Sequence, residues 1–292
     1  MSVRPHEYRM REYAGGDVFP FQIGGATVEG RFPEHTHDFA ELVVILAGTG
    51  RHVINGRTYR VGPGDVSVFN LGAAHGFEDS RGLEMVNVMY APSLLAAAGP
   101  DLRSLPGFQA LFAISPTAGG EYRCMMRLDK PGLGWVSAAL KRMVAEFASR
   151  REGYQTLLRS QLLELAVYLS RRYSHDAVSV EGPPGALRLA EVAGYMAARF
   201  REPLTVGALA ERAGLSRRHF IRLFRRIYGT TPVQHLLDLR LRHAAALLGQ
   251  AGRSVTQVAF DSGFADSNYF TRRFTKCFGA PPGRFRTQRA GR

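Results

Sequence analysis

Hydrophobic residues in the first third of the chain occur in short runs, each ended by a glycine or proline turn. The runs at 41–50, 65–72 and 83–92 are rich in β-branched and aliphatic residues, and no long helical pattern separates them. Asn55-Gly56 stands between two further β-prone segments, and this pair favours a two-residue hairpin turn because both positions tolerate positive φ. The spacing predicts a small antiparallel β-barrel or sandwich.

From Gly134 the hydrophobic period changes from that of a strand to that of a helix. Apolar residues recur at steps of three and four in two segments on either side of Gly153. They are Val136, Leu140, Met143, Val144 and Phe147, then Leu157, Leu158, Leu162, Leu165 and Leu169. The pattern predicts an antiparallel helix pair over 134–176, which either forms a dimer contact or packs on the barrel of its own chain. Pro183-Pro184-Gly185 bars a further helix and indicates a linker at 177–186.

The last part of the chain is helical and contains one unit twice. Ala210 and Gly214 recur 49 residues later as Ala259 and Gly263. At a spacing of 50, Phe220, Phe224, Gly229 and Pro232 recur as Phe270, Phe274, Gly279 and Pro282. The change in spacing falls in a turn between helices, where an insertion is tolerated. Six matches at nearly one spacing indicate an internal repeat.

Each copy has the pattern of two short helices around a glycine turn. In the first copy, Ser216 is a suitable N-cap for the second helix, which would bury Phe220 and Phe224. The opposite side of that helix carries Arg217, Arg218, Ile221, Arg222 and Arg225. A basic outer face on the second helix is typical of a helix-turn-helix motif, in which that helix enters the major groove of DNA.

In the second copy, short polar side chains stand where the second helix begins. Asn pairs with adenine, Ser and Thr bond several bases, and Arg binds guanine or phosphate. We therefore expect DNA contacts from Asp266, Ser267, Asn268, Thr271 and Arg272. The alternative for Asp266 is a plain N-cap, and for any single arginine a solvated helix face.

The distribution of charge supports a polyanion partner. The net charge is +13, but residues 1–180 carry 19 Lys and Arg against 18 Asp and Glu. Residues 181–292 carry 19 against 7. A basic module beside a nearly neutral one favours nucleic acid as the partner of that module, although a merely solvated basic surface is the alternative.

The repeated unit carries a family resemblance. Residues Leu187–Arg286, with LAERAGLSRRHFIRLFRRIYGTTPVQHL and VAFDSGFADSNYFTRRFTKCFGAPPGRFR, resemble the DNA-binding domain of AraC/XylS transcription regulators. The resemblance implies two recognition helices set one DNA turn apart, roughly 34 Å, by a connecting helix at Val233–Leu248. It implies that Arg218, Ile221 and Arg222 face bases in the first reader, with Ile221 in place of the usual polar residue. It also implies promoter DNA and RNA polymerase as partners, and an activator.

The amino-terminal part contains a candidate ligand site. His35, His37 and Glu41 share parity, so on one extended strand they lie on one face, and His75 can join them from a neighbouring strand. Three imidazoles and a carboxylate suit a divalent transition metal. The alternatives are a pocket that hydrogen-bonds sugar hydroxyls and an inherited set without a ligand. Arg31 is a further candidate for the effector site.

The spacing around these residues resembles the metal-binding motif of cupin barrels, although Asn70 and Asp79 depart from it. The segment FPEHTHDFAELVVILAGTGRHVINGRTYRVGPGDV is similar to regulators of rhamnose catabolism. This resemblance implies a sugar effector such as L-rhamnose. No nucleophile and base constellation is visible, so we expect no enzyme and no required cofactor.

These patterns together predict a multi-domain α+β protein. A cupin-like effector barrel spans 1–133, a helix pair for dimerisation 134–176, a linker 177–186, and an all-α domain with two helix-turn-helix motifs 187–292. The predicted function is sequence-specific, effector-controlled DNA binding by a homodimeric transcription regulator. A metal-dependent cupin isomerase or dioxygenase anchored to DNA and a nucleoid protein binding by charge alone are the rivals. Two cysteines, no signal-peptide core and no membrane-length apolar run favour the cytoplasm and no membrane partner.

Overall fold

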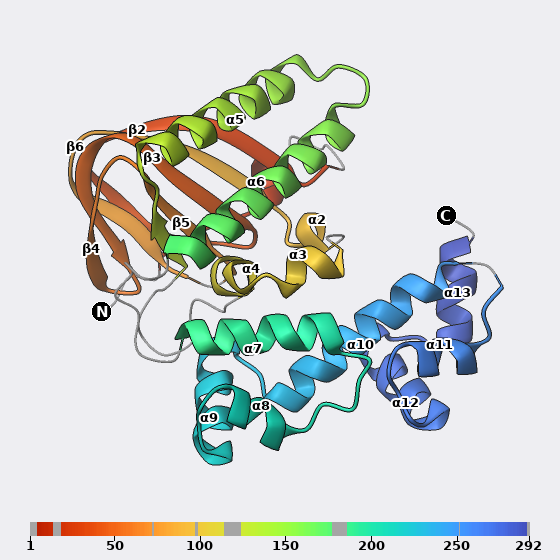
Figure 1. Ribbon diagram of the computed structural model, residues 1–292. Helices are drawn as coiled ribbons and strands as arrows, with labels where there is room; N and C mark the ends of the chain where they lie inside the picture. The colour runs from red at the N-terminus through yellow and green to blue at the C-terminus, as the bar shows by residue number, and fades with distance from the viewer. Residues whose placement is uncertain are drawn as a thin grey trace. The chain divides into compact units, whose positions relative to one another are not determined.

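The computed structural model describes residues 5–13, 19–71, 73–96, 99–113, 124–176, 186–250 and 252–290. They form two compact units, one made mainly of the residues up to Glu191 and the other mainly of those from Val192. A sheet-rich amino-terminal domain and an all-helical carboxy-terminal one confirm the predicted α+β class (Figure 1). None of the described helices is long and apolar enough to cross a bilayer.

The amino-terminal unit is built on one seven-stranded sheet with the order β1-β2-β6-β3-β5-β7, and β4 pairs with β3. The strands are β1 (His6–Tyr8), β2 (Phe21–His37), β3 (Ala40–Ile54), β4 (Arg57–Val61), β5 (Asp65–Phe69), β6 (His75–Tyr90) and β7 (Met125–Arg127). Along the described residues the pairing is an open path, so the predicted barrel does not close into a ring. The predicted hairpin is present between β3 and β4, because Asn55 and Gly56 have φ of 49° and 74°.

Three long strands supply most of the sheet. β6 pairs antiparallel with both β2 and β3, so residues far apart in sequence meet on its two sides. The β2–β6 register shifts three times, between Val28 and Gly30, Gly30 and Phe32, and Phe32 and His35. Such bulges change which face of the sheet a side chain occupies. They bring His35 of β2 opposite His75 of β6.

Short helices and a longer pair accompany the sheet. They are α1 (Met10–Tyr13), α2 (Ser93–Ala96), α3 (Pro100–Ser104), α4 (Pro106–Leu111), α5 (Lys130–Ser149) and α6 (Tyr154–Asp176). Helix α5 begins four residues before the predicted Gly134, because the Asp129 side chain accepts a hydrogen bond from Gly132 N and Pro131 suits the first turn. Helix α5 packs on β2, and α6 packs on α5 and α4 (Figure 1).

From Ala186 on, the described residues form helices and the connections between them. The helices are α7 (Ala186–Arg199), α8 (Val206–Arg212), α9 (Arg217–Tyr228), α10 (Pro232–Leu248), α11 (Val255–Asp261), α12 (Ser267–Phe278) and α13 (Pro282–Ala290). The sequence repeat is a structural repeat: α8 and α11 have 7 residues each, and α9 and α12 have 12 each. The turn glycines also match, with φ of 65° at Gly214 and 85° at Gly263.

An aromatic core holds the second copy together. Phe270 and Phe274 of α12 are fully buried, and Phe274 also lies 4.5 Å from Phe278 and 5.2 Å from Phe285 between ring centroids. Leu241 and Ala244 of α10 belong to the same cluster. The apolar side of α12 is therefore buried in the core, and its polar side is available for contacts outside the unit.

Candidate effector pocket and DNA-reading surface

A cavity of about 330 Å³ is lined mainly by residues of β2, β3 and β6, and its volume is in the range of small-molecule sites. β2 presents small residues to it, Gly24, Gly25 and Ala26, and a Cβ added at Gly24 would meet no atom within 4 Å. The rest of the wall is mostly apolar, with a few polar side chains. Its other members are Tyr8, Gln22, Val28, Phe32, His35, Phe39, Glu41, Val43, His75, Phe77, Met85, Asn87 and Met89.

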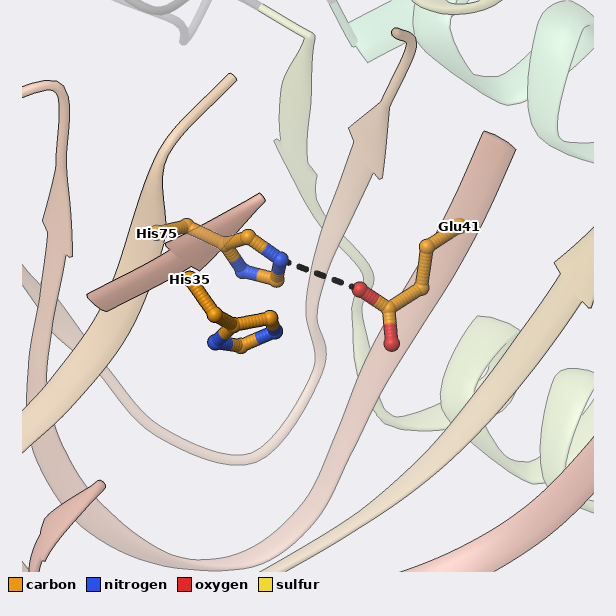
Figure 2. Close-up of side chains that lie close together, drawn as sticks. All are labelled: His35, Glu41 and His75. Atoms are coloured by element: carbon orange, nitrogen blue, oxygen red, sulfur yellow. Dashed lines mark ion pairs between the residues drawn. The ribbon is translucent and has the colours of Figure 1, made fainter. Parts of the chain in front are cut away.

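At one part of this wall, three polar side chains from three strands meet. His35 comes from β2, Glu41 from β3 and His75 from β6, and one ligand atom of each lies within 4.8 Å of the other two. Figure 2 shows the two imidazole rings beside each other, 4.3 Å apart between centroids, with the Glu41 carboxylate facing His75. His75 lies beside His35 and Glu41 as expected, but the expectation that His35, His37 and Glu41 share one strand is wrong, because β2 ends at His37 and β3 begins at Ala40. Which ligand the three residues bind stays a prediction.

Hydrogen bonds fix which nitrogen of two histidines is free. His35 Nδ1 lies 3.2 Å from the carbonyl oxygen of Pro33, and His37 Nδ1 lies 2.6 Å from that of Phe39. Since a carbonyl oxygen only accepts, Nδ1 carries the proton in both rings, and each Nε2 keeps a lone pair. These are the tautomers that a ligand-binding imidazole requires.

Burial sets the charge state of the cluster. It lowers the pKa of His35 and His37 from 6.5 to about 4, and that of His75 to about 3. The same desolvation raises the pKa of Glu41, and the nearby His37 and His35 oppose it. Neutral imidazoles beside a buried carboxyl group form a site that lacks positive charge, so it favours a cation or hydroxyl donors.

Two of the predicted site residues stand apart from this cluster. His37 is buried, with Nε2 3.6 Å from Glu41 Oε2, but it is not among the three residues that meet, nor does it line the cavity. Arg31 is exposed, with Nε 3.8 Å from Glu78 Oε1 and its side chain 72% accessible, and it lies outside the cavity wall. The bulges of β2 between Val28 and His35 interrupt the regular alternation of side chains along the strand. Arg31 and His35 therefore do not lie on the same face.

Three polar residues of the site were missed from the sequence. His52 is buried, with Nε2 3.3 Å from His75 Nδ1. Gln22 and Asn87 line the cavity, and Asn87 Oδ1 is a buried atom without a hydrogen-bond partner among the described residues. A signal for Asn87 does exist: it alternates with Met85 and Met89, which also line the cavity, whereas Val86 and Val88 are buried elsewhere.

The candidate DNA-reading surface lies on α9 and α12. In α9, Phe220 and Phe224 are buried, while the predicted contacts lie on the accessible side. Arg217, Arg218, Arg222 and Arg225 are exposed, and Ile221 is half-buried. This division of faces is what a recognition helix requires.

The first turn of α12 is well defined by its cap. Asp266 Oδ1 accepts hydrogen bonds from Asn268 N at 2.6 Å and from Tyr269 N at 2.9 Å. The carboxylate thereby satisfies two backbone donors of the helix start, and the pKa of Asp266 is lowered by these bonds. Asn268 and Arg272 are exposed, and Ser267 and Thr271 are half-buried. Asp266 is thus an N-cap, and a base contact by it stays a prediction.

Comparisons with known families match both units. A family described as an AraC-like ligand binding domain matches residues 26–166, which include the polar cluster and most of the cavity wall. A family described as a helix-turn-helix domain matches residues 209–288, which include α9 and α12. Their order along the chain is the order predicted from the sequence.

Relatives cover nearly the whole chain. The transcriptional activator RhaS of Escherichia fergusonii is 32% identical over 279 residues, 94% of this chain and 96% of that protein. The transcriptional activator RhaR of Escherichia coli is 28% identical over 275 residues, 92% of this chain and 94% of its own length. The DNA-binding domain of AdpA, solved in complex with a target DNA, is 36% identical and covers 36% of this chain and 96% of that one, with a TM-score of 0.35.

The two matched families account for the two units of the structure, with the ligand-binding domain before the helix-turn-helix domain. The relatives are transcriptional activators and not enzymes, which answers the isomerase and dioxygenase alternatives. The chain belongs to the AraC family, and it is a DNA-binding transcription regulator controlled by a small-molecule effector.

Proposed function

We propose that this regulator activates genes for the use of a sugar and that the sugar, L-rhamnose or a close analogue, binds in the cavity of the amino-terminal unit. The observation that carries the proposal is the cavity itself, whose wall combines apolar side chains with His35, Glu41 and His75. A sugar offers both apolar C–H faces and hydroxyl groups, which such a mixed wall can bind. The relatives RhaS and RhaR support the choice of sugar and of activation.

Three polar residues of the wall have a role in this proposal. The free Nε2 of His35 accepts a hydroxyl hydrogen bond, and the Glu41 carboxylate accepts another. The unpartnered Asn87 Oδ1 accepts a third. A sugar hydroxyl that satisfies a buried polar atom removes its desolvation cost, about 1–3 kcal/mol, so hydroxyl stereochemistry decides which sugar binds.

Calorimetric titration of the full chain with L-rhamnose and other monosaccharides tests the effector proposal. Gly24→Val should abolish binding, because its side chain would enter the cavity without meeting the protein. The matched control is Thr58→Val in β4, since Thr58 is exposed. Gly56→Val, at the β3–β4 turn outside the cavity, is unsuitable as a control because Gly56 has positive φ. If no monosaccharide binds the wild type, the sugar proposal is wrong.

The same cluster is proposed to accept a divalent transition-metal ion. Two imidazole nitrogens and a carboxylate oxygen are donors that such ions bind. Ligand atoms at about 2.1 Å from one ion lie within about 4.2 Å of each other, so the observed group, within 4.8 Å, needs only a small side-chain adjustment. His37 is the fourth ligand expected from the sequence; because it lies outside the group of three, a bond from its Nε2 to the ion stays a prediction.

On DNA, we propose that α9 and α12 read two successive major-groove segments. Asn268 is proposed to bind adenine, with Ser267, Thr271 and Arg272 on neighbouring bases or phosphates. Arg218, Ile221 and Arg222 are proposed for the first reader, and Arg217 and Arg225 for phosphate. Exposure of the arginines and of Asn268 supports these roles.

Binding measurements on a selected operator and on random DNA test the reader role. Asn268→Ala should weaken operator binding by about 1–3 kcal/mol and relax preference at one base pair. Arg225→Ala is the matched comparison, because loss of a phosphate contact weakens both DNAs alike and lowers the salt dependence. Equal losses on both DNAs for Asn268→Ala would contradict the assignment.

The remaining assignments are proposals of assembly and place. We propose a cytoplasmic homodimer that contacts RNA polymerase, with domains at 1–133, 134–176 and 187–292. The linker 177–186 lies outside the described residues except for Ala186, where α7 begins.

Much of the apolar surface of α5 and α6 is already covered within the chain, but Leu157 remains 44% exposed. Light scattering of Leu157→Lys against the wild type tests this dimer contact.

A further inference from the structure

His52 is a buried histidine that neither lines the cavity nor belongs to the group of three. Its Nε2 lies 3.3 Å from Nδ1 of His75, on the side of His75 that faces away from Glu41. It stacks on Phe77 at 4.1 Å between centroids, while His75 stacks on Phe69 at 3.9 Å. These aromatic contacts restrict ring rotation, so the two imidazoles keep their facing nitrogens together.

A hydrogen bond between two neutral imidazoles has one donor and one acceptor. If His52 Nε2 carries the proton, His75 Nδ1 accepts it, and the remaining proton of His75 is on Nε2. If His75 Nδ1 carries the proton, His52 Nε2 accepts it, and His75 Nε2 has a lone pair. The position of the proton on His52 therefore determines what His75 Nε2 offers on the side of Glu41. It is either an N–H donor or a lone pair that can bind a metal ion.

The two choices suit two states of the cluster. In the first, the Nε2–H of His75 points toward Glu41 Oε2 at 3.2 Å (Figure 2), although the alignment is too poor for a full hydrogen bond and both atoms count as unpartnered among the described residues. In the second, His35, His75 and Glu41 each have a lone pair available, on ligand atoms that lie within 4.8 Å of one another. A metal ion binds only the second state, because a protonated nitrogen cannot be a ligand.

We propose that His52 is a positioning residue which supplies the tautomer of His75 needed for a divalent transition-metal ion, and that the ion's open coordination positions take two oxygens of the effector. The inference rests on the proposed effector site. His35, Glu41 and His75 all lie on the cavity wall, so an ion held by them faces the cavity. With three protein ligands, an ion that expands to five-coordinate has two positions left, and neighbouring hydroxyls of a sugar can fill them.

The proton count balances without an added reactant. On passing from the first state to the second, His75 loses the proton at Nε2 and gains one at Nδ1. His52 loses the proton at Nε2 and gains one at its other nitrogen. Both rings remain neutral, so ion binding needs no change in the net charge of the pair.

Metal affinity of the full chain, measured without sugar by competition between Zn²⁺ or Co²⁺ and a coloured chelator, tests the role of His52. His52→Leu removes the acceptor for His75 Nδ1–H and should weaken metal binding about 10–100-fold, as expected for loss of such a partner. His52→Gln restores an acceptor oxygen and should remain within a few-fold of the wild type. His219→Ala changes an exposed histidine of α9 and should have no effect.

Imidazole nitrogen NMR of the wild-type protein provides a second test that needs no variant. Without metal, the His75 proton should be on Nε2, and with Zn²⁺ on Nδ1. A proton on Nε2 of His75 in the presence of Zn²⁺, or equal metal affinity of His52→Leu and the wild type, would overturn the role of His52. Absence of any metal binding would overturn it as well.

The link to the effector is tested separately, by titrating L-rhamnose with and without a chelator. We expect sugar affinity to fall at least about tenfold in chelator and to recover with Zn²⁺, since two ligand positions are lost. Unchanged sugar affinity in chelator would refute the link and leave the proposed effector site intact. Failure of the sugar to bind even with metal would instead count against the proposed effector.

Discussion

Gly263 offers a sharp test of how the second helix-turn-helix is held. It has φ of 85° in the turn between α11 and α12, and an added Cβ would lie 2.7 Å from Arg201 Cα and 2.9 Å from Arg201 O. Gly279, which ends α12, has a similar φ of 73°, but an added Cβ there would meet nothing within 4 Å. The two glycines therefore differ in steric contact and share the backbone conformation.

Alanine substitutions should separate these two effects. Gly279→Ala carries only the cost of the left-handed conformation, about 1–2 kcal/mol. Gly263→Ala adds overpacking against backbone that cannot rotate away, about 1–3 kcal/mol. We therefore expect a loss in the free energy of unfolding of about 2–5 kcal/mol for Gly263→Ala, with α12 displaced and operator binding weakened.

Urea unfolding of the full chain can follow the two units separately. Trp135, the single tryptophan of the sequence, lies in α5 and stacks on Tyr168 at 3.8 Å, so its fluorescence reports the amino-terminal unit. Circular dichroism at helical wavelengths includes the other unit. Gly263→Ala should shift the helical transition and leave the tryptophan transition in place. Equal losses for Gly263→Ala and Gly279→Ala would refute the steric part of the reasoning.

The remaining predictions concern the core and pH. Phe274→Ala should cost about 3–5 kcal/mol in unfolding free energy, whereas Phe260→Ala, at a side chain 54% exposed, should cost under about 0.5 kcal/mol; similar losses in urea melts would contradict the described core. Burial, with a smaller effect from Arg242, lowers the pKa of His235 from 6.5 to about 4. Between these values the unfolded chain binds a proton at this residue that the folded chain does not, so His235 alone should lower stability on acidification by about 2 kcal/mol at about pH 5. His235→Gln should flatten this dependence in thermal melts, and an unchanged slope would show that His235 does not cause it.

The repeat was predictable because its constraints are local. Gly214 and Gly263 each end a short helix in a conformation that favours glycine, and the buried phenylalanines recur with a helical period. The equal lengths of the matched helices follow from these markers. The outward positions then follow by exclusion, since a helix that buries Phe270 and Phe274 must expose Asn268 and Arg272.

The effector site was only partly predictable because its residues meet through strand pairing. The sequence spacing grouped Glu41 with His35 and His37, but the assumed single strand was wrong, because β2 ends at His37 and β3 begins at Ala40. The register shifts of β2 determine where His35 and Arg31 point, and no local sequence pattern predicts them. His52 depends on β3 pairing with β6, which places it near His75. Asn87 had a usable signal in its alternation with methionines, which sequence reasoning did not use.

The origin of the cluster on three separate strands makes it a property of the folded state alone. An unfolded chain does not bring together His35, Glu41 and His75, so a compound that needs all three binds only native molecules. By mass action, a ligand at 100 times its dissociation constant adds about 2.7 kcal/mol of stability. A collection of sugars and metal ions can therefore be ranked by the melting temperature they confer, before any operator is known.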